Sequence, residues 1–256
     1  MDNTQRMIRL LGRLRREMNG AVAESMRCYG RDYGLNYGVS IPTIRAIARE
    51  EECDDGFARY LYVQQVRELR LAALHLADAS LLNIGDADFW AAGIINSEVA
   101  EEAAFAFLSH AQALPEIFRA WCPVEDDGGK SNPEGADDMQ GEMLAYAALM
   151  AAARARMIIL CPDAGDAAVK ALNRYPQSRI VGHGVATLLG GAFDAGDITL
   201  QTALRLVAAS ICPCSSSMLS GTWLFLPVSS HLSSSSRYTN RCFPCLMTGI
   251  PPCLAL

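Results

Sequence analysis

Residues 34–52, GLNYGVSIPTIRAIAREEE, contain a complete start signal for a helix. Gly34 and Gly38 mark a loop, and Ser40 is a residue type that often caps the first helical turn. Pro42 falls in that first turn, where its missing N–H removes no helical hydrogen bond. The segment therefore predicts a loop that ends at Ser40 and a helix that follows it.

The sequence on both sides predicts further helices and almost no strand. Apolar residues recur at helical spacing within residues 7–18, and the Ala-rich segment 139–160 is the clearest helix in the chain. Further helices are expected within 20–30, 57–65, 66–78, 86–95, 96–111, 114–122, 165–175, 178–193 and 198–210. Short turns join them, and they pair at intervals of roughly 40 residues. This rhythm predicts an all-α fold, a HEAT-like or armadillo-like α–α superhelix built as a solenoid of antiparallel helix pairs.

The amino-acid composition changes near residue 210. Residues 1–210 hold all 28 acidic residues and 20 of the 22 basic ones, which gives a net charge of −8. Residues 211–256 hold five of the nine Cys, five of the eleven Pro and only two charged residues, both Arg. A solenoid usually ends in a charged capping repeat, and no such repeat is visible here. We therefore predict a HEAT-repeat domain at 1–210 and a Ser/Cys/Pro-rich tail at 211–256 that is disordered or frameshifted.

The termini and cysteines predict a soluble protein in a reducing, cytoplasmic setting. The N-terminal segment has no apolar core of a secretory signal, and no run of about 18 apolar residues predicts a membrane span. Four cysteines stand singly among helix-forming residues, as buried small hydrophobes do, namely Cys28, Cys53, Cys122 and Cys161. The overall charge of −6 excludes a uniformly basic surface for nucleic acid, although a local basic face is compatible with it.

The chain shows no sequence motif for a nucleophilic serine, a zinc protease, a dinucleotide or a phosphate-binding loop. Two cysteine pairs in the tail could be interpreted as a zinc site, Cys212 with Cys214 and Cys242 with Cys245. The first pair has only one residue between its cysteines, whereas structural zinc sites usually have two to four. We therefore expect no metal and no cofactor.

Two sequence blocks carry a resemblance to a known family. They are GVSIPTIRAIA at 38–48 and RELRLA at 67–72. Together they resemble the DNA alkylation repair proteins of the AlkD type, and the helical rhythm extends the resemblance over roughly residues 5–208. The resemblance implies HEAT-like repeats whose concave face holds duplex DNA by its backbone. The best-known members excise alkylated purines without flipping the base into a pocket.

The resemblance also implies a catalytic carboxylate with three cleft residues. In the family an Asp at the start of a helix stabilises the positive charge that develops on the sugar, and two Trp and an Arg complete the cleft. The matching positions hold Glu101 for the Asp, Ser97 for the first Trp, Glu142 or Met143 for the Arg and His183 for the second Trp. Three of the four positions thus depart from the family pattern, and the fourth keeps only a carboxylate.

Arginine supplies 20 of the 22 basic residues, which favours bidentate binding of anions such as phosphate. The candidates for DNA contacts are Arg6, Arg9, Arg13 and Arg16 near the N-terminus, then Arg45, Arg49, Arg67 and Arg70. The same arginines could instead form a solvated face, and Glu68 competes for Arg67 and Arg70. Acids such as Glu101 are also favoured at a helix start by the helix dipole, without any catalytic role.

Two functions therefore remain open. The first is a DNA alkylation repair-like protein that binds duplex DNA and excises N-alkylated purines as a DNA glycosylase. The alternative is a non-catalytic HEAT-repeat module that binds structured DNA or a protein partner. Neither function involves a membrane.

Overall fold

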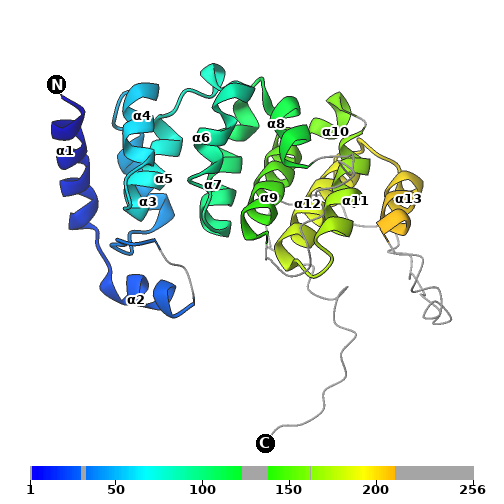
Figure 1. Ribbon diagram of the computed structural model, residues 1–256, viewed down its shortest axis with the longest axis horizontal. Coiled ribbons are helices and arrows are strands. Elements are labelled where there is room, and N and C mark those ends of the chain that lie inside the picture. The colour runs from blue at the N-terminus through cyan, green and yellow to red at the C-terminus, as the bar shows by residue number, and fades with distance from the viewer. Residues whose placement is uncertain (1, 30–32, 123–137, 162, 211–256) are drawn as a thin grey trace, which may run out of the picture. The chain divides into compact units, whose positions relative to one another are not determined.

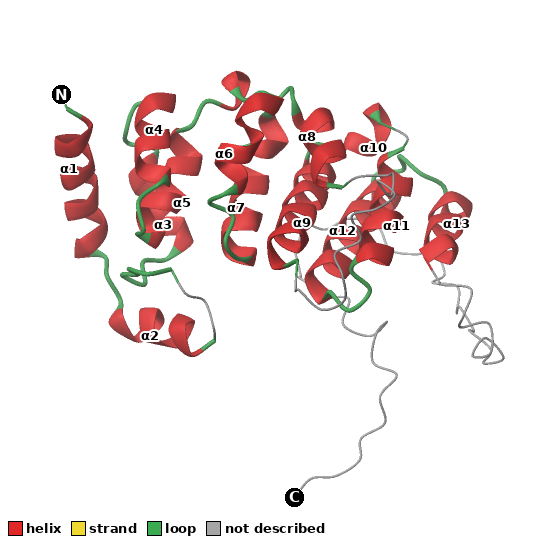
Figure 2. Cartoon of the chain, viewed as in Figure 1, coloured by secondary structure: helices red, strands yellow, loops and turns green. Residues whose placement is uncertain are grey.

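The computed structural model describes residues 2–29, 33–122, 138–161 and 163–210 (Figure 1). Within these ranges every regular element is a helix, as Figure 2 shows, and this confirms the predicted all-α class. The predicted tail at 211–256, with its two cysteine pairs, lies outside the described residues. Among the described helices, none is both long and apolar enough to cross a membrane.

The helices follow one another with short connections. Their bounds are α1 Asn3–Arg16, α2 Gly20–Cys28, α3 Ile41–Ala48, α4 Asp55–Tyr62, α5 Arg67–Leu76, α6 Ala87–Ala91, α7 Ser97–Ala106, α8 Leu114–Trp121, α9 Met139–Arg154, α10 Met157–Leu160, α11 Ala164–Arg174, α12 Arg179–Asp194 and α13 Leu200–Ser210. Three 3-10 turns lie between them, Ala79–Leu81, Ile84–Asp86 and Leu108–His110.

Side chains cap several helices at the positions that the sequence indicates. The Ser40 hydroxyl accepts a hydrogen bond from the Thr43 amide at the start of α3, as predicted. The Asn96 side chain accepts one from the Val99 amide at the start of α7. Each cap satisfies an amide that has no partner within the helix. The cap at Asn96 fixes where α7 begins.

The expectation of a single helix over residues 139–160 is wrong. The chain leaves the helix after Arg154, because Arg156 has a positive φ of 52°, and a second short helix starts at Met157. The guanidinium of Arg156 donates to Asp197 with its Nε at 3.0 Å, which holds the break in place. An Ala-rich pattern gives no warning of such a break, since the partner lies 41 residues further along.

The helices pack on their neighbours in sequence and on helices further along the chain. One series of contacts runs from α3 to α5, α7, α9 and α12. The last three of these helices carry Ser97, Glu101, Glu142 and His183. A second set packs on this series, with α4 against α5, α8 against α9 and α11 against α12. This order of contacts is what a stack of helix pairs requires. The superhelical HEAT-like form stays a prediction.

An aromatic cluster anchors the middle of the described core. The Trp90 ring centre lies 4.7 Å from that of Tyr62 and 4.6 Å from that of Phe107, and Trp90 is 2% exposed. The Tyr62 hydroxyl donates to the Trp90 carbonyl at 2.7 Å. Trp90 is thus a core residue and offers no surface to a ligand.

Gly38 brings the loop before α3 close to the start of α2. Its φ is +71°, and a Cβ atom there would lie 2.1 Å from the Asn19 carbonyl oxygen. The Asn19 amide in turn donates to the Tyr37 carbonyl at 2.8 Å. Only glycine allows both this backbone conformation and this approach. The backbone conformation and this close approach therefore explain why glycine stands at position 38 of the GVS block.

Candidate functional site

Three acidic residues near the start of α7 lie in three different environments. Glu98 and Glu102 are buried, at 6% and 2% exposure, whereas Glu101 is exposed. Residues four apart share a face of a helix, so Glu98 and Glu102 point to the same side. Glu101 is rotated about the helix axis by about 100° from Glu102 and by about 60° from Glu98. The packing of α7 therefore leaves only Glu101 open to a ligand.

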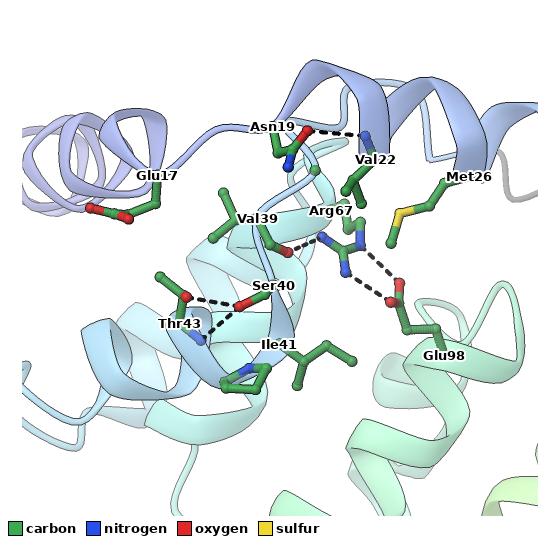
Figure 3. A pocket seen from close by; sticks show the side chains of 12 residues that line it. Glu17, Asn19, Val22, Met26, Val39, Ser40, Ile41, Thr43, Arg67 and Glu98 are labelled. Atoms are coloured by element: carbon green, nitrogen blue, oxygen red, sulfur yellow. Dashed lines mark hydrogen bonds and ion pairs between the residues drawn. The ribbon is translucent and has the colours of Figure 1, made fainter.

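Glu98 forms a buried ion pair with Arg67. The Arg67 Nε and one terminal nitrogen donate to the two Glu98 oxygens, each at 2.8 Å, and the other terminal nitrogen donates to the Val39 carbonyl at 2.8 Å. Figure 3 shows this arrangement. The Tyr33 hydroxyl also donates to Glu98. Burial, followed by the charge of Glu98, raises the pKa of Tyr33, so the hydroxyl stays a donor.

The burial of Arg67 corrects its assignment as a DNA contact. Arg67 is 1% exposed and its guanidinium is bonded to Glu98, Glu68 and the Val39 carbonyl. A phosphate could reach it only if this pairing were broken. We therefore remove Arg67 from the candidate DNA-binding set and assign it a structural role.

A pocket of about 440 Å³ opens beside this ion pair (Figure 3). Val22 and Met26 of α2 and Ile41 at the start of α3 give it apolar walls. Arg67 and Glu98 form part of its lining but are bonded to each other. The pocket therefore presents a mainly apolar surface rather than a charged binding site.

Glu102 joins α7 to α3 and α5. Arg45 binds it with two parallel hydrogen bonds, from Nε at 2.8 Å and from a terminal nitrogen at 2.7 Å. The His75 Nε2 atom lies 2.5 Å from the same carboxylate. Arg45 keeps 39% of its side chain exposed, so it stays a candidate for a DNA contact.

Glu101 accepts a hydrogen bond from Tyr146 on α9. The Tyr146 hydroxyl lies 2.8 Å from Glu101 Oε1, and Tyr146 itself is 1% exposed. Burial, followed by the hydrogen bond to Glu101, raises the pKa of Tyr146. Tyr146 therefore stays protonated at neutral pH, and its hydroxyl orients the Glu101 carboxylate.

His183 on α12 lies next to this pair. Its ring centre is 6.3 Å from that of Tyr146, and His183 is exposed. Gly184 lets α12 approach α9 closely, since a Cβ atom there would lie 3.0 Å from the Leu149 Cβ and 3.2 Å from the Tyr146 ring. The glycine after His183 thus has a packing reason. Tyr146 thus has Glu101 at its hydroxyl and His183 beside its ring.

The other two cleft candidates are Ser97 and Glu142. They lie one helical turn before Glu101 and Tyr146, on α7 and α9. Ser97 precedes Glu101 by four residues on α7, and Glu142 precedes Tyr146 by four residues on α9. Both are partly buried. Sequence reasoning missed Tyr146, although it is the only aromatic residue of α9 and shares a face with Glu142.

Most of the N-terminal arginine stripe pairs with acids near the α3–α4 connection. Arg6 lies 2.5 Å from Asp54 and its guanidinium stacks 3.9 Å from the Phe57 ring centre. Arg9 is 3.7 Å from Glu51, and Arg13 pairs with Glu50 and Glu51. These pairs compete with phosphate.

The remaining candidates differ in their surroundings. Arg16 and Arg49 are exposed and form no ion pair with any described residue. The Arg70 Nε donates to the Tyr62 carbonyl at 3.4 Å. Their role in DNA contact stays a prediction. Over the described part of the chain, no three His, Cys, Asp or Glu side chains cluster as metal ligands.

Comparison with known proteins finds a match for part of this sequence. No curated protein and no solved structure matches the chain significantly. A family model does match, over residues 10–113, from within α1 to the residue before α8. The match includes Ser97 and Glu101, whereas Glu142, Tyr146 and His183 lie beyond it. The resemblance is thereby confirmed for this part of the chain: residues 10–113 carry the sequence pattern of the DNA alkylation repair enzyme family.

Proposed function

We propose that this protein acts in DNA alkylation repair, binding duplex DNA on a concave surface of its helix stack and excising N-alkylated purines. The observation that carries the proposal is Glu101, an exposed carboxylate held by Tyr146 beside His183. Glu101 lies within the segment that matches the repair family. The series α7, α9 and α12 supplies the three side chains, and these helices contact one another in that order.

The chemistry requires a negative charge near the sugar. An N-alkylated purine is cationic, so it leaves as a neutral base when the electron pair of the C1′–N bond moves onto it. The sugar then carries oxocarbenium character, which a nearby carboxylate stabilises. Water adds to C1′ and loses its proton to the carboxylate or to solvent, which leaves an abasic site. Glu101 would supply the carboxylate.

Tyr146 and His183 support this role in different ways. Tyr146 donates to one carboxylate oxygen from a buried position, which fixes the direction of Glu101 before DNA binds. His183 has an exposed ring beside that of Tyr146. A ring there can pack against the sugar or the cationic base, as aromatic faces attract cations.

Glu101→Gln is expected to slow base release by about 10²-fold, because the amide keeps the shape of the side chain and loses its charge. The measurement is release of 7-methylguanine and 3-methyladenine from duplex DNA in single-turnover reactions. The control variant is Glu116→Gln on α8, an exposed acid outside the site, which should release base at the wild-type rate. Release that is unchanged in Glu101→Gln would refute the role of Glu101.

One observation favours the alternative function, a non-catalytic module. Arg6, Arg13 and Arg45 are already paired with acids, and Arg67 is buried. The same assay decides between the two. Salt-sensitive DNA binding without base release would support a DNA-binding module, and the absence of both would favour a protein partner.

A further inference from the structure

An exposed arginine stacks on a phenylalanine close to Glu101. Arg154 is the last residue of α9, and its guanidinium carbon lies 5.7 Å from the ring centre of Phe105 on α7. Phe105 is partly buried, whereas Arg154 is exposed. The ring holds the guanidinium by a cation–π contact, which limits the freedom of a long side chain.

Arg154 differs from nine arginines of the described residues in its charge environment. Ion pairs with acids occupy Arg6, Arg9, Arg13, Arg27, Arg45, Arg59, Arg67, Arg156 and Arg174. Arg154 forms no ion pair with any acid in the described ranges. Its guanidinium makes a cation–π contact with the Phe105 ring instead. Its positive charge is therefore held in place without being neutralised by those acids.

The position of this pair relates it to the proposed site. Phe105 lies one turn beyond Glu101 on α7, on the same face, at a distance of about 6 Å along the axis. Arg154 lies two turns beyond Tyr146 on α9, about 12 Å along the axis. The contacts Glu101–Tyr146 and Phe105–Arg154 thus join the same two helices at successive levels. Arg154 therefore lies on the helix that packs beside Glu101, at the level of Phe105.

We infer that Arg154, held on Phe105, binds a phosphodiester group of the DNA strand whose sugar faces Glu101. This inference rests on the proposed function. A guanidinium is planar and presents paired donors that match two phosphate oxygens. Successive nucleotides of a duplex rise by about 3.4 Å, so a phosphate within a few nucleotides of the reacting sugar falls within reach of the side chain.

Arg154→Ala is expected to weaken duplex DNA binding about tenfold at low salt and to lower the slope of log K against log salt by about 0.9. The measurement is fluorescence anisotropy of a labelled, undamaged duplex over a series of salt concentrations. Arg119→Ala is the matched control, because Arg119 is exposed on α8 and removes the same charge. Its affinity and salt slope should stay near those of the wild type.

Two further variants separate charge from position. Arg154→Lys keeps the charge and loses the paired donors, so it should keep the salt slope with a roughly threefold to fivefold loss of affinity. Phe105→Leu removes the ring and should weaken binding twofold to threefold with an unchanged slope. Thermal melting of each variant checks that the fold is retained.

The outcomes distinguish this inference from the proposed function. Wild-type binding by Arg154→Ala would overturn the inference alone, and base release that depends on Glu101 would still support the function. Weakened binding by Arg154→Ala without any base release from the wild type would support the inference and the non-catalytic alternative. A wild-type protein that does not bind duplex DNA at low salt would overturn both.

Discussion

Glu98→Gln is expected to lower the free energy of unfolding by about 3–5 kcal/mol, the range for removing one partner of a buried ion pair. The change leaves the Arg67 guanidinium, 1% exposed, without the carboxylate that now receives two of its hydrogen bonds. It also removes the charged acceptor of the Tyr33 hydroxyl. Three segments meet at the Glu98 carboxylate: the loop after α2, α5 and α7. Removing its charge therefore weakens the contacts among all three.

The matched control for this variant is Glu101→Gln, the same chemical change three residues further along α7. Glu101 is exposed, and a Gln oxygen can still accept the Tyr146 hydrogen bond, so the expected loss is below about 1 kcal/mol. Urea unfolding followed by circular dichroism measures both. Equal losses in the two variants would contradict the structural role assigned to Glu98.

This pair of variants also separates a loss of base release caused by lost stability from one caused by lost chemistry. A loss of base release in Glu98→Gln should be accompanied by a loss of stability, whereas Glu101→Gln should lose base release with the fold intact. The neighbouring acids of α7 can therefore be assigned to structure or to chemistry by comparing stability with rate.

The local structure of the chain could be predicted from its sequence to a large extent. Ser40 caps α3 as its residue type and position predict, because capping depends on groups only three residues apart. The helical periodicity likewise gave the all-α class. The end of α9 at Arg154 escaped prediction, since the bond that holds Arg156 comes from Asp197.

The environment of each acid and arginine could not be predicted in the same way. The helical pattern alone does not separate Glu98, Glu101 and Glu102, and the packing of α5 and α9 against α7 decides which of them is exposed. Arg45 meets Glu102 from 57 residues away, and Arg6 meets Asp54 from 48. Helical spacing does not predict ion pairs between residues so far apart in the sequence. Tyr146 was missed for the same reason, because its role depends on Glu101 of another helix.

The stability of the fold is expected to fall steeply in acid through Glu102. Burial alone would raise the pKa of Glu102, but hydrogen bonds from Arg45 and His75 outweigh it and lower the pKa from 4.5 to about 2. Because the folded-state pKa lies below the unfolded one, the ionised carboxylate stabilises the fold fully above about pH 4.5. This contribution, about 3 kcal/mol in total, is lost as the pH falls towards 2.

The comparison of wild type with Glu102→Gln isolates this carboxylate from the others that titrate in acid. Asp54, for example, also has a lowered pKa, caused first by its hydrogen bond from Arg6, and it contributes equally to both proteins. The difference in unfolding free energy between the two proteins should therefore shrink by about 2 kcal/mol from pH 6 to pH 3. A difference that stays constant over this range would mean that Glu102 is not held ionised by Arg45 and His75. Arg45 would then be free of its acidic partner, and its side chain would be a stronger candidate for a phosphate contact than its present pairing allows.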